Sequence, residues 1–402
     1  MELVRTTLAL RLDCTLGYAE QNQQLSHWVD GSNVYGSSQE AENRLREFQR
    51  GRLKISRGVG RSSLLPLNGK ENEVFEAGDV RVNEAVNLAA IHTIFMREHN
   101  RLAESLRLLN GHFWNDEKIY QEARRILGAV IQHITYNEFL PLVLGLRYML
   151  NVGLLPLLNG YKNDYDPTIN PQITNEFATA AFRFGHTKIP GQWRLLFGEN
   201  SRPRTINLSD HLNNPNLLFQ TRAVDAFIRA YSRNPAETTD GAFTDEFRGK
   251  LFKERGRPFG MDLMSLNIQR SRDHGIPGYN EYREICQLGK CRDWSDAVRV
   301  FGASVSTDPD PVALPIKRNK AVGRLQQVYA HVDDVDLFVG GMLEPIVPGA
   351  EVGSVFLCII GDQFIRLQRG DRFYYEWGDQ PHSFTLRKYC KNKTARLLHK
   401  MA

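Results

Sequence analysis

Apolar residues recur at spacings of three and four along several long segments, and this periodicity predicts a mainly helical protein. The pattern holds over residues 84–109, where Asn110-Gly111 then supplies a helix-ending pair. A second helix is expected after Asn115, a residue type that caps helix N-termini, and Pro141 should limit its extent. Both segments direct one apolar stripe toward a core.

Three further helices are predicted, over residues 174–188, 215–232 and 322–332. The segments near 162–172 and 305–316 are rich in proline and aspartate, which is typical of long surface loops. No internal repeat and no Pro/Gly/Ser-rich linker divides the sequence. We therefore expect a mainly α fold with few short strands, in a single domain over residues 1–402.

Composition excludes some classes of function. The chain has 402 residues, 42% of them hydrophobic, which suffices for a large core. Its net charge of +5 is not arranged as a basic stripe interleaved with aromatic residues, so nucleic-acid binding is not expected. The densest basic run, residues 44–61, is typical of a solvated surface loop, with attraction to a polyanion as the alternative.

The most apolar segment, residues 139–158, contains Arg147, Asn151 and two prolines. A membrane-spanning helix needs about 20 predominantly apolar residues, so we expect buried helix and loop here and no membrane span. The N-terminal residues from Met1 to Thr7 lack the apolar core of a signal peptide.

One histidine stands in an apolar, helix-compatible segment, Ala181-Phe182-Arg183-Phe184-Gly185-His186. A neutral imidazole in a dry pocket is the axial ligand that a haem iron requires. A histidine among phenylalanines is also common as a core residue whose ring nitrogens are hydrogen-bonded. The segment alone leaves both interpretations open.

Two further segments carry polar residues at helical spacing. Arg81 and Glu84 open the first predicted helix on one face, either as an ordinary ion pair or as an arginine facing a bound peroxide beside a carboxylate. Asn267 and Arg270 share a face in the polar segment 266–280, which ends in the turn signal Gly-Ile-Pro-Gly. The Asn267 oxygen would accept the Nδ1–H of an axial histidine, unless the segment forms only a buried polar network.

Four motifs resemble those of the animal haem peroxidases. They are Ala-Gly-Asp-x-Arg-x-x-Glu at 77–84, Met-Arg-Glu-His-Asn-Arg-Leu-Ala at 96–103, Phe-Arg-Phe-Gly-His-Thr at 182–187 and Leu-Asn-Ile-Gln-Arg-Ser-Arg-Asp-His-Gly at 266–275. The likeness runs from about residue 2 to about residue 395 and looks most like the chorion peroxidase and peroxidasin branch. It implies a large helical domain built around a haem.

The resemblance implies a role for each polar residue of the candidate site. It makes His186 the proximal ligand of the haem iron and Asn267 its hydrogen-bond partner. It makes Arg81 the distal arginine that stabilises the transition state. Arg183 and Arg270 match positions that face haem propionates.

Two further features of the resemblance concern the cofactors. Glu84 matches a glutamate that can form an ester link to haem b, and Ala85 excludes the link that a methionine at this position makes in some relatives. The segment 26–32 resembles the family's calcium loop, although without the likeness it is typical of a turn. The ligands implied for calcium are oxygen atoms of Ser26, Trp28, Asp30 and Ser32.

The resemblance also indicates which family residues have no match in this sequence. The family's distal histidine, a nearby glutamine, a calcium-binding aspartate and a second ester-forming aspartate correspond to positions upstream of Met1. His92 and His99 match no catalytic position. We therefore expect a domain truncated at its N-terminus, with an incomplete calcium site, in which Arg81 stabilises charge but transfers no proton.

Five cysteines are present, so at least one has no partner within the chain. The resemblance pairs Cys286 with Cys358 and implies that the partners of Cys14 and Cys390 lie at or beyond the chain ends. Cys291 stays unassigned.

The expected function is that of a haem peroxidase that uses H2O2 to oxidise phenolic donors such as tyrosine, or halides. Two alternatives stay open: a catalytically weak or inactive haem-binding homologue, and a catalase-like relative in which H2O2 is also the reductant. By family the protein would be extracellular, with eggshell, cuticle or matrix proteins as further partners. The sequons at Asn207 and Asn392 favour a secreted glycoprotein.

Overall fold

The structure is a computed structural model that describes residues 3–9, 17–18, 20–69, 74–198, 200–254, 256–302, 322–378 and 380–384. The α-helices are α1 Ser32–Tyr35, α2 Gln39–Leu45, α3 Val86–Asn110, α4 Asp116–His133, α5 Leu140–Leu144, α6 Leu146–Asn151, α7 Asn175–Thr179, α8 Ala223–Arg233, α9 Asp245–Arg248, α10 Leu263–Asp273, α11 Tyr279–Ile285, α12 Trp294–Gly302, α14 Leu337–Leu343 and α15 Ser354–Arg369. The strands are β1 Ser56–Arg57, β2 Ser63–Leu64, β3 Gln192–Leu195 and β4 Arg204–Asn207. The short 3-10 turns are η1 Val59–Arg61, η2 Val80–Asn83, η4 Ala181–Lys188, η5 Leu208–His211, η6 Pro215–Phe219 and η7 Val332–Asp334, and η3 Ile134–Phe139 is π-helical.

Helices dominate the fold, and the strands are few and short, as the apolar periodicity predicts. β1 pairs with β2, and β3 pairs with β4, each as an antiparallel two-stranded sheet. In the second sheet Gln192 lies opposite Asn207. The mainly α fold class is therefore confirmed.

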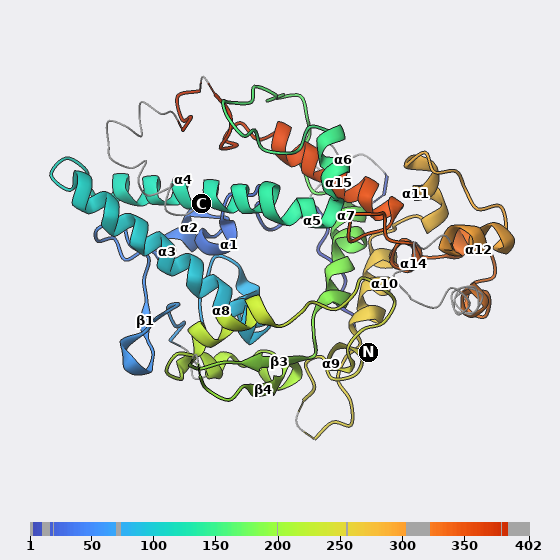
Figure 1. Cartoon of the computed structure of the whole chain (residues 1–402), viewed down its shortest axis with the longest axis horizontal. Helices are drawn as coiled ribbons and strands as arrows, with labels where there is room; N and C mark the ends of the chain where they lie inside the picture. Colours follow the sequence, from blue (N-terminus) through green and yellow to red (C-terminus); the bar gives the residue numbers. More distant parts are fainter. Residues whose placement is uncertain are drawn as a thin grey trace.

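The two longest helices, α3 and α4, lie side by side (Figure 1). α3 ends at Asn110, as predicted, and the Asn115 side chain accepts a hydrogen bond from a backbone N–H in the first turn of α4. α4 ends at His133, well before Pro141, and the chain passes through η3 into α5. Pro141 lies in the first turn of α5, where a missing N–H costs no hydrogen bond.

The segment 174–188 is not one continuous α-helix, in contrast to the prediction. α7 ends at Thr179, Ala180 has φ −129° and ψ −72°, and η4 follows. The Thr179 carbonyl accepts a hydrogen bond from the Ser271 hydroxyl of α10. A side chain thus binds a carbonyl at the break, and the chain then tightens into the 3-10 turn that carries His186.

The other two predicted helices are also shorter than the pattern suggests. The segment 215–232 divides into η6 and α8, because Arg222 between them takes a left-handed conformation with φ 62°. Within 322–332 the chain is α-helical only over 322–326, and the 3-10 turn η7 begins at Val332. The predicted loop 305–316, together with Cys14, Cys390 and Asn392, lies outside the described residues.

Two large clusters of buried apolar residues organise the fold. One includes residues of α5, α11, α14, α15 and η4, and the other includes residues of α3, α4 and α8. Phe184, beside His186, belongs to the first cluster, and Val82, beside Arg81, belongs to the second. The two halves of the candidate site are therefore anchored on different parts of the core.

Arg46 shows that the basic run 44–61 is not simply a solvated loop. Its side chain is buried, donates hydrogen bonds to Asp116 and Glu117, and lies over the ring of Tyr120. Two carboxylates and an aromatic face compensate the buried charge, so this arginine joins α4 to the segment after α2.

The apolar segment 139–158 forms α5, α6 and the following loop. It is only partly buried, since Leu140 and Met149 are fully covered while Leu142 and Leu146 are exposed. Among the described residues no helix is both long and apolar enough to cross a membrane.

A disulfide joins Cys286, at the end of α11, to Cys358 in α15, which confirms the expected pairing. Cys291 is buried and has a free thiol.

Candidate functional site

His186 lies on η4 with its Nδ1 3.0 Å from the amide nitrogen of Asn267 on α10. Burial, followed by the charge of Arg183, lowers the pKa of His186 to about 4. The ring is therefore neutral at physiological pH, as a metal-binding imidazole must be. No hydrogen-bond partner of Nε2 occurs among the described residues.

The Asn267 amide lies between two side chains. Its oxygen accepts a hydrogen bond of 2.9 Å from Arg183 Nη1, and its nitrogen faces His186. The residue is completely buried. The structure thus brings Asn267 and His186 together as expected, but the amide is turned the other way from the expected arrangement. A guanidinium has only donors, so the atom that meets Arg183 must be the oxygen.

The sequence predicts that Arg81 and Glu84 open the long helix, but in the structure they precede it. Arg81 lies on η2 and Glu84 caps its end, while Ala85 is extended and α3 starts at Val86. Because residues three apart eclipse in a 3-10 turn, Arg81 and Glu84 still lie on one side. The Glu84 pKa is raised by burial, although the nearby Arg81 opposes the shift.

The ion-pair partner of Arg81 is Asp79 and not Glu84. Arg81 Nε lies 3.0 Å from Asp79 Oδ1 and Nη2 lies 2.6 Å from Oδ2. Burial alone would raise the Asp79 pKa, but the hydrogen bonds from Arg81 outweigh it and lower the pKa. Asp79 is absent from the residues predicted for the site, although an aspartate just before a helical turn is a recognisable capping signal.

Positive charge gathers around Arg183, which lies three residues before His186 in η4. The pKa of Arg183 is lowered to about 10, first by burial and then by the charges of Arg270 and Arg81. The guanidinium groups of Arg81 on η2 and Arg270 on α10 therefore both lie within electrostatic range of Arg183 on η4. Such a cluster favours an anionic ligand, because each cation raises the free energy of the others.

Arg270 already has partners within the protein. Its Nη1 lies 2.9 Å from the Val4 carbonyl and 2.8 Å from both Thr6 Oγ1 and Asp273 Oδ2. Arg5 pairs with the same Asp273. This contact between the first described segment and α10 was not foreseen, since no local signal in residues 3–9 indicates it.

The predicted calcium loop closes around Asp30. Ser26 Oγ donates to Asp30 Oδ2 and the Ser32 N–H donates to Oδ1, both at 2.8 Å, while the Trp28 N–H lies 3.3 Å from Ser26 Oγ. Among the described residues no group of three or more His, Cys, Asp or Glu side chains is arranged to hold a metal ion. The four loop residues are thus close together, and Asp30 is the carboxylate among them.

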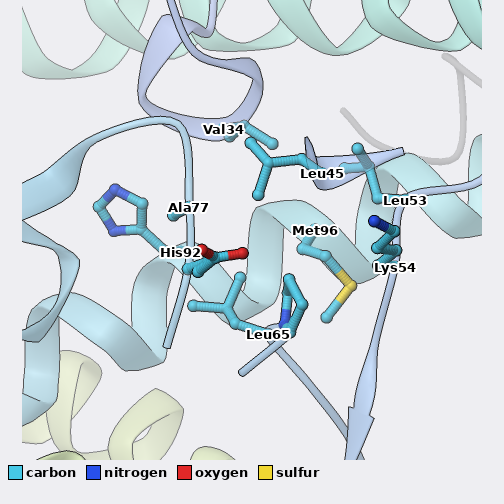
Figure 2. Close-up of a pocket in the computed structure, with 10 residues that line it drawn as sticks. Val34, Leu45, Leu53, Lys54, Leu65, Ala77, His92 and Met96 are labelled. Atoms are coloured by element: carbon cyan, nitrogen blue, oxygen red, sulfur yellow. The ribbon is translucent and has the colours of Figure 1, made fainter. Parts of the chain in front are cut away.

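A small cavity of about 10 Å³ lies apart from these residues, against α3 (Figure 2). Its walls are mainly apolar, with Leu45, Leu65 and Met96 around it, and His92 lies at its edge beside Ala77. The cavity has room for about one water molecule. It is therefore too small for a cofactor.

A neutral imidazole and nearby guanidinium groups, held on a mainly helical fold, have the chemistry that suits a haem iron and its propionates. The sequence profile of the animal haem peroxidases matches residues 1–400. The chain belongs to the animal haem peroxidase family.

Particular relatives show how far the similarity extends. The chorion peroxidase of Aedes aegypti is 40% identical over 397 residues, covering 96% of this chain and 47% of that protein. The peroxidasin of Drosophila melanogaster is 39% identical over 379 residues, covering 89% of this chain and 23% of that protein. This chain thus spans about half the length of the chorion peroxidase.

Solved structures also match the fold. Peroxidase A from Dictyostelium discoideum superposes with a TM-score of 0.78 at 32% identity, over 98% of this chain and 75% of that one. A fatty acid alpha-dioxygenase from Oryza sativa superposes with a TM-score of 0.67 at 21% identity, over 92% of this chain and 62% of that one, which shows a shared fold alone.

The family implies a haem cofactor, and the residues present suit one. His186 offers a neutral imidazole whose Nε2 has no partner among the described residues. Arg183 and Arg270 supply positive charge of the kind that two propionates would neutralise.

Proposed function

We propose that this chain is a peroxidase that binds haem b and uses H2O2 to oxidise small phenolic donors, such as tyrosine, or halides. The observation that carries the proposal is the neutral, partly buried His186 ring beside Arg183, which itself lies within electrostatic range of Arg81 and Arg270, in a member of this family. Haem, when bound, supplies the redox chemistry.

Each residue of the site would have a distinct task. His186 would hold the iron through Nε2, and Asn267 would orient the ring. Arg183 and Arg270 would bind the propionates as charge-assisted hydrogen-bond donors.

Arg81 would stabilise the negative charge that develops when the O–O bond of the peroxide breaks. Asp79 would hold its guanidinium through Nε and Nη2. Nη1 has no hydrogen-bond partner among the described residues, so it would be the donor available to the peroxide. Glu84, whose carboxyl carries no hydrogen bond in the described part of the chain, would be the residue that forms an ester with haem.

The second candidate function is a catalytically weak haem-binding homologue. Cleavage of peroxide requires a base that takes and returns a proton. Within the described residues no histidine is hydrogen-bonded to Arg81, and His92 Nδ1 is bound to the Leu88 carbonyl with Nε2 buried. This observation favours the weaker activity.

We also propose that the loop of Ser26, Trp28, Asp30 and Ser32 contributes to a calcium site. The loop oxygens are already close together, and Asp30 would exchange its two internal hydrogen bonds for the ion. Calorimetric titration with CaCl2 tests this, because Asp30→Asn should abolish any heat of binding. A wild-type chain that gives no heat contradicts it.

The domain organisation, location and partners of the protein are also proposals. We propose that residues 1–402 form one domain of an extracellular protein that acts on eggshell, cuticle or matrix components. Asn207, exposed at the end of β4, would carry a glycan.

Titration of the purified chain with hemin, followed by the Soret band, tests cofactor binding. His186→Ala should lose the band, whereas His112→Ala, which changes an exposed histidine, should keep it. A Soret band that survives His186→Ala contradicts the assignment of the iron ligand.

Guaiacol oxidation by H2O2 then separates the two candidate functions. Turnover by the hemin-loaded chain supports the peroxidase, and haem uptake without turnover supports the weak homologue. Oxygen release from H2O2 without guaiacol would indicate the catalase-like alternative.

A further inference from the structure

The side chain of Asn267 is held between Arg183 and His186, and among the described residues each of its two polar atoms has one hydrogen-bond neighbour. Arg183 Nη1 donates to Oδ1 at 2.9 Å, and His186 Nδ1 lies 3.0 Å from Nδ2. Because Asn267 is completely buried, bulk water does not reach its side chain, so each polar atom depends on its protein neighbour.

The chemistry of these groups fixes the direction of both hydrogen bonds. Arg183 carries five N–H donors and no acceptor, so Oδ1 must face it and Nδ2 must face the imidazole. Nδ2 is itself only a donor, so His186 Nδ1 accepts and is unprotonated. In a neutral ring the proton is then on Nε2.

Iron binding through Nε2 requires the opposite tautomer. The Nε2 lone pair must point to the metal, and the proton moves to Nδ1, where it needs an acceptor. Asn267 provides one only if its amide turns so that Oδ1 faces the ring. That turn would place Nδ2 against the Arg183 donors, which is unfavourable while Arg183 stays in place.

We propose that Arg183 is a positioning residue that controls the tautomer of His186 through Asn267. With its guanidinium on Asn267 Oδ1, the ring is held in the tautomer that cannot bind iron. When the guanidinium moves to a carboxylate ligand, the amide is free to turn and the ring can present Nε2. This inference rests on the proposed function only in taking Nε2 as the iron-binding atom.

The surroundings of Arg183 favour its departure to a carboxylate. Its charge lies within range of Arg270 and Arg81, and its partners Asn267 Oδ1 and the Ala178 carbonyl are both neutral. A charge-assisted hydrogen bond to a carboxylate is about twice as strong as one to a neutral oxygen. A haem propionate would therefore bind the Arg183 guanidinium and, by removing it from Asn267, allow His186 to present its Nε2 lone pair to the iron.

Arg270 provides a natural comparison, because it carries the same charge but is held elsewhere. Its Nη1 contacts Val4, Thr6 and Asp273, and no hydrogen bond from Arg270 to Asn267 occurs among the described residues. Removing Arg270 should therefore leave the His186 tautomer unchanged.

The test is ¹⁵N NMR of the ligand-free chain, labelled at histidine, at neutral pH. His186 is one of 11 histidines, and its ring signals are assigned by their loss in His186→Ala. The wild-type ring should be protonated on Nε2. In Arg183→Met the ratio of the Nδ1–H tautomer to the Nε2–H tautomer should rise roughly fivefold, because one hydrogen bond contributes about 1 kcal/mol net.

Two further variants complete the test. In Asn267→Asp the carboxylate accepts from both neighbours, so the ring should become Nδ1–H with Arg183 still present. Arg270→Met is the matched control and should retain the wild-type ratio. A wild-type ring already protonated on Nδ1, or an Arg183→Met ratio equal to that of the wild type, overturns the proposal.

Sodium propionate serves as a probe for the carboxylate without haem. At matched ionic strength it should shift the wild-type ring toward Nδ1–H, whereas sodium chloride should not, and Arg183→Met should show no propionate response. A propionate response that persists in Arg183→Met also overturns the proposal.

Because these readings use no haem, they are independent of peroxidase activity. Absence of a Soret band on adding hemin would contradict the proposed function while leaving the NMR result as it stands.

Discussion

At the scale of single residues, the motifs identify candidate side chains for the site but not how those side chains pair. His186, Asn267 and Arg183 were selected from the sequence, and the structure brings them into contact. The orientation of the Asn267 amide could not be predicted, because it depends on a donor that is distant in sequence. Helical spacing also pairs Arg81 with the wrong carboxylate, since η2 turns the guanidinium back toward Asp79 and not toward Glu84.

The pairing of Arg81 with Asp79 leads to a prediction about catalysis. In the haem-loaded chain, Arg81→Ala should lower the kcat of H2O2-dependent guaiacol oxidation about 100-fold, the usual effect of removing a donor that stabilises developing charge. Asp79→Asn should lower kcat about tenfold, because the guanidinium keeps its charge but loses its support. The Soret band should stay intact in both variants.

An exposed aspartate–arginine pair on α9 supplies the control for this prediction. Asp245→Asn changes the partner of Arg248 and should leave kcat unchanged. If Asp79→Asn retains the wild-type kcat, the proposed support of Arg81 by Asp79 is wrong.

At the scale of elements, the sequence predicts a helix boundary where a local signal such as a capping residue sets it. It fails where contacts with a distant part of the chain set the boundary. The start of α4 follows from Asn115 alone. The break at Ala180 does not, because the apolar pattern continues across it while Ser271 binds the Thr179 carbonyl from another helix. The burial of Arg46 likewise depends on carboxylates that α4 supplies from a distant part of the chain.

His99 in α3 leads to a prediction about stability and pH. It is buried, accepts a hydrogen bond from the Tyr35 hydroxyl at Nδ1 and donates to the Gly51 carbonyl from Nε2. Burial lowers the pKa of His99 from 6.5 to about 4. The unfolded chain therefore binds a proton at a higher pH than the folded chain, and the free energy of unfolding falls as the pH falls from 6.5 toward 4. The largest loss from this group is about 3 kcal/mol.

Urea unfolding at several pH values between 4 and 7 measures the effect of His99. In His99→Gln the amide can replace both hydrogen bonds without titrating, so its stability should fall less steeply on acidification than that of the wild type. His112→Gln, at an exposed position, should follow the wild-type profile. Parallel profiles for the wild type and His99→Gln would show that His99 does not govern the acid sensitivity.

At the scale of the whole molecule, the sequence predicts the fold class well because many motifs agree in order and spacing along the chain. It does not predict how the core divides. One cluster of buried residues carries η4 with His186, and the other carries η2 with Arg81. Arg183 and Arg81 nevertheless lie within electrostatic range, so the site depends on how the two clusters are held together.

The disulfide between Cys286 and Cys358 stabilises the cluster that carries His186. It links α11 to α15 across 72 residues of sequence, and α15 packs directly against η4. Closing a loop of this length restricts the unfolded chain, so replacing both cysteines by alanine should lower the free energy of unfolding by about 4 kcal/mol.

Urea unfolding measures this loss of stability, and a reductant should reproduce it in the wild type but not in the double variant. Hemin titration at 25 °C should still give a Soret band, because the native contacts of η4 do not involve the sulfur atoms. Equal stability of the wild type and the double variant would mean that packing alone holds α11 and α15 together.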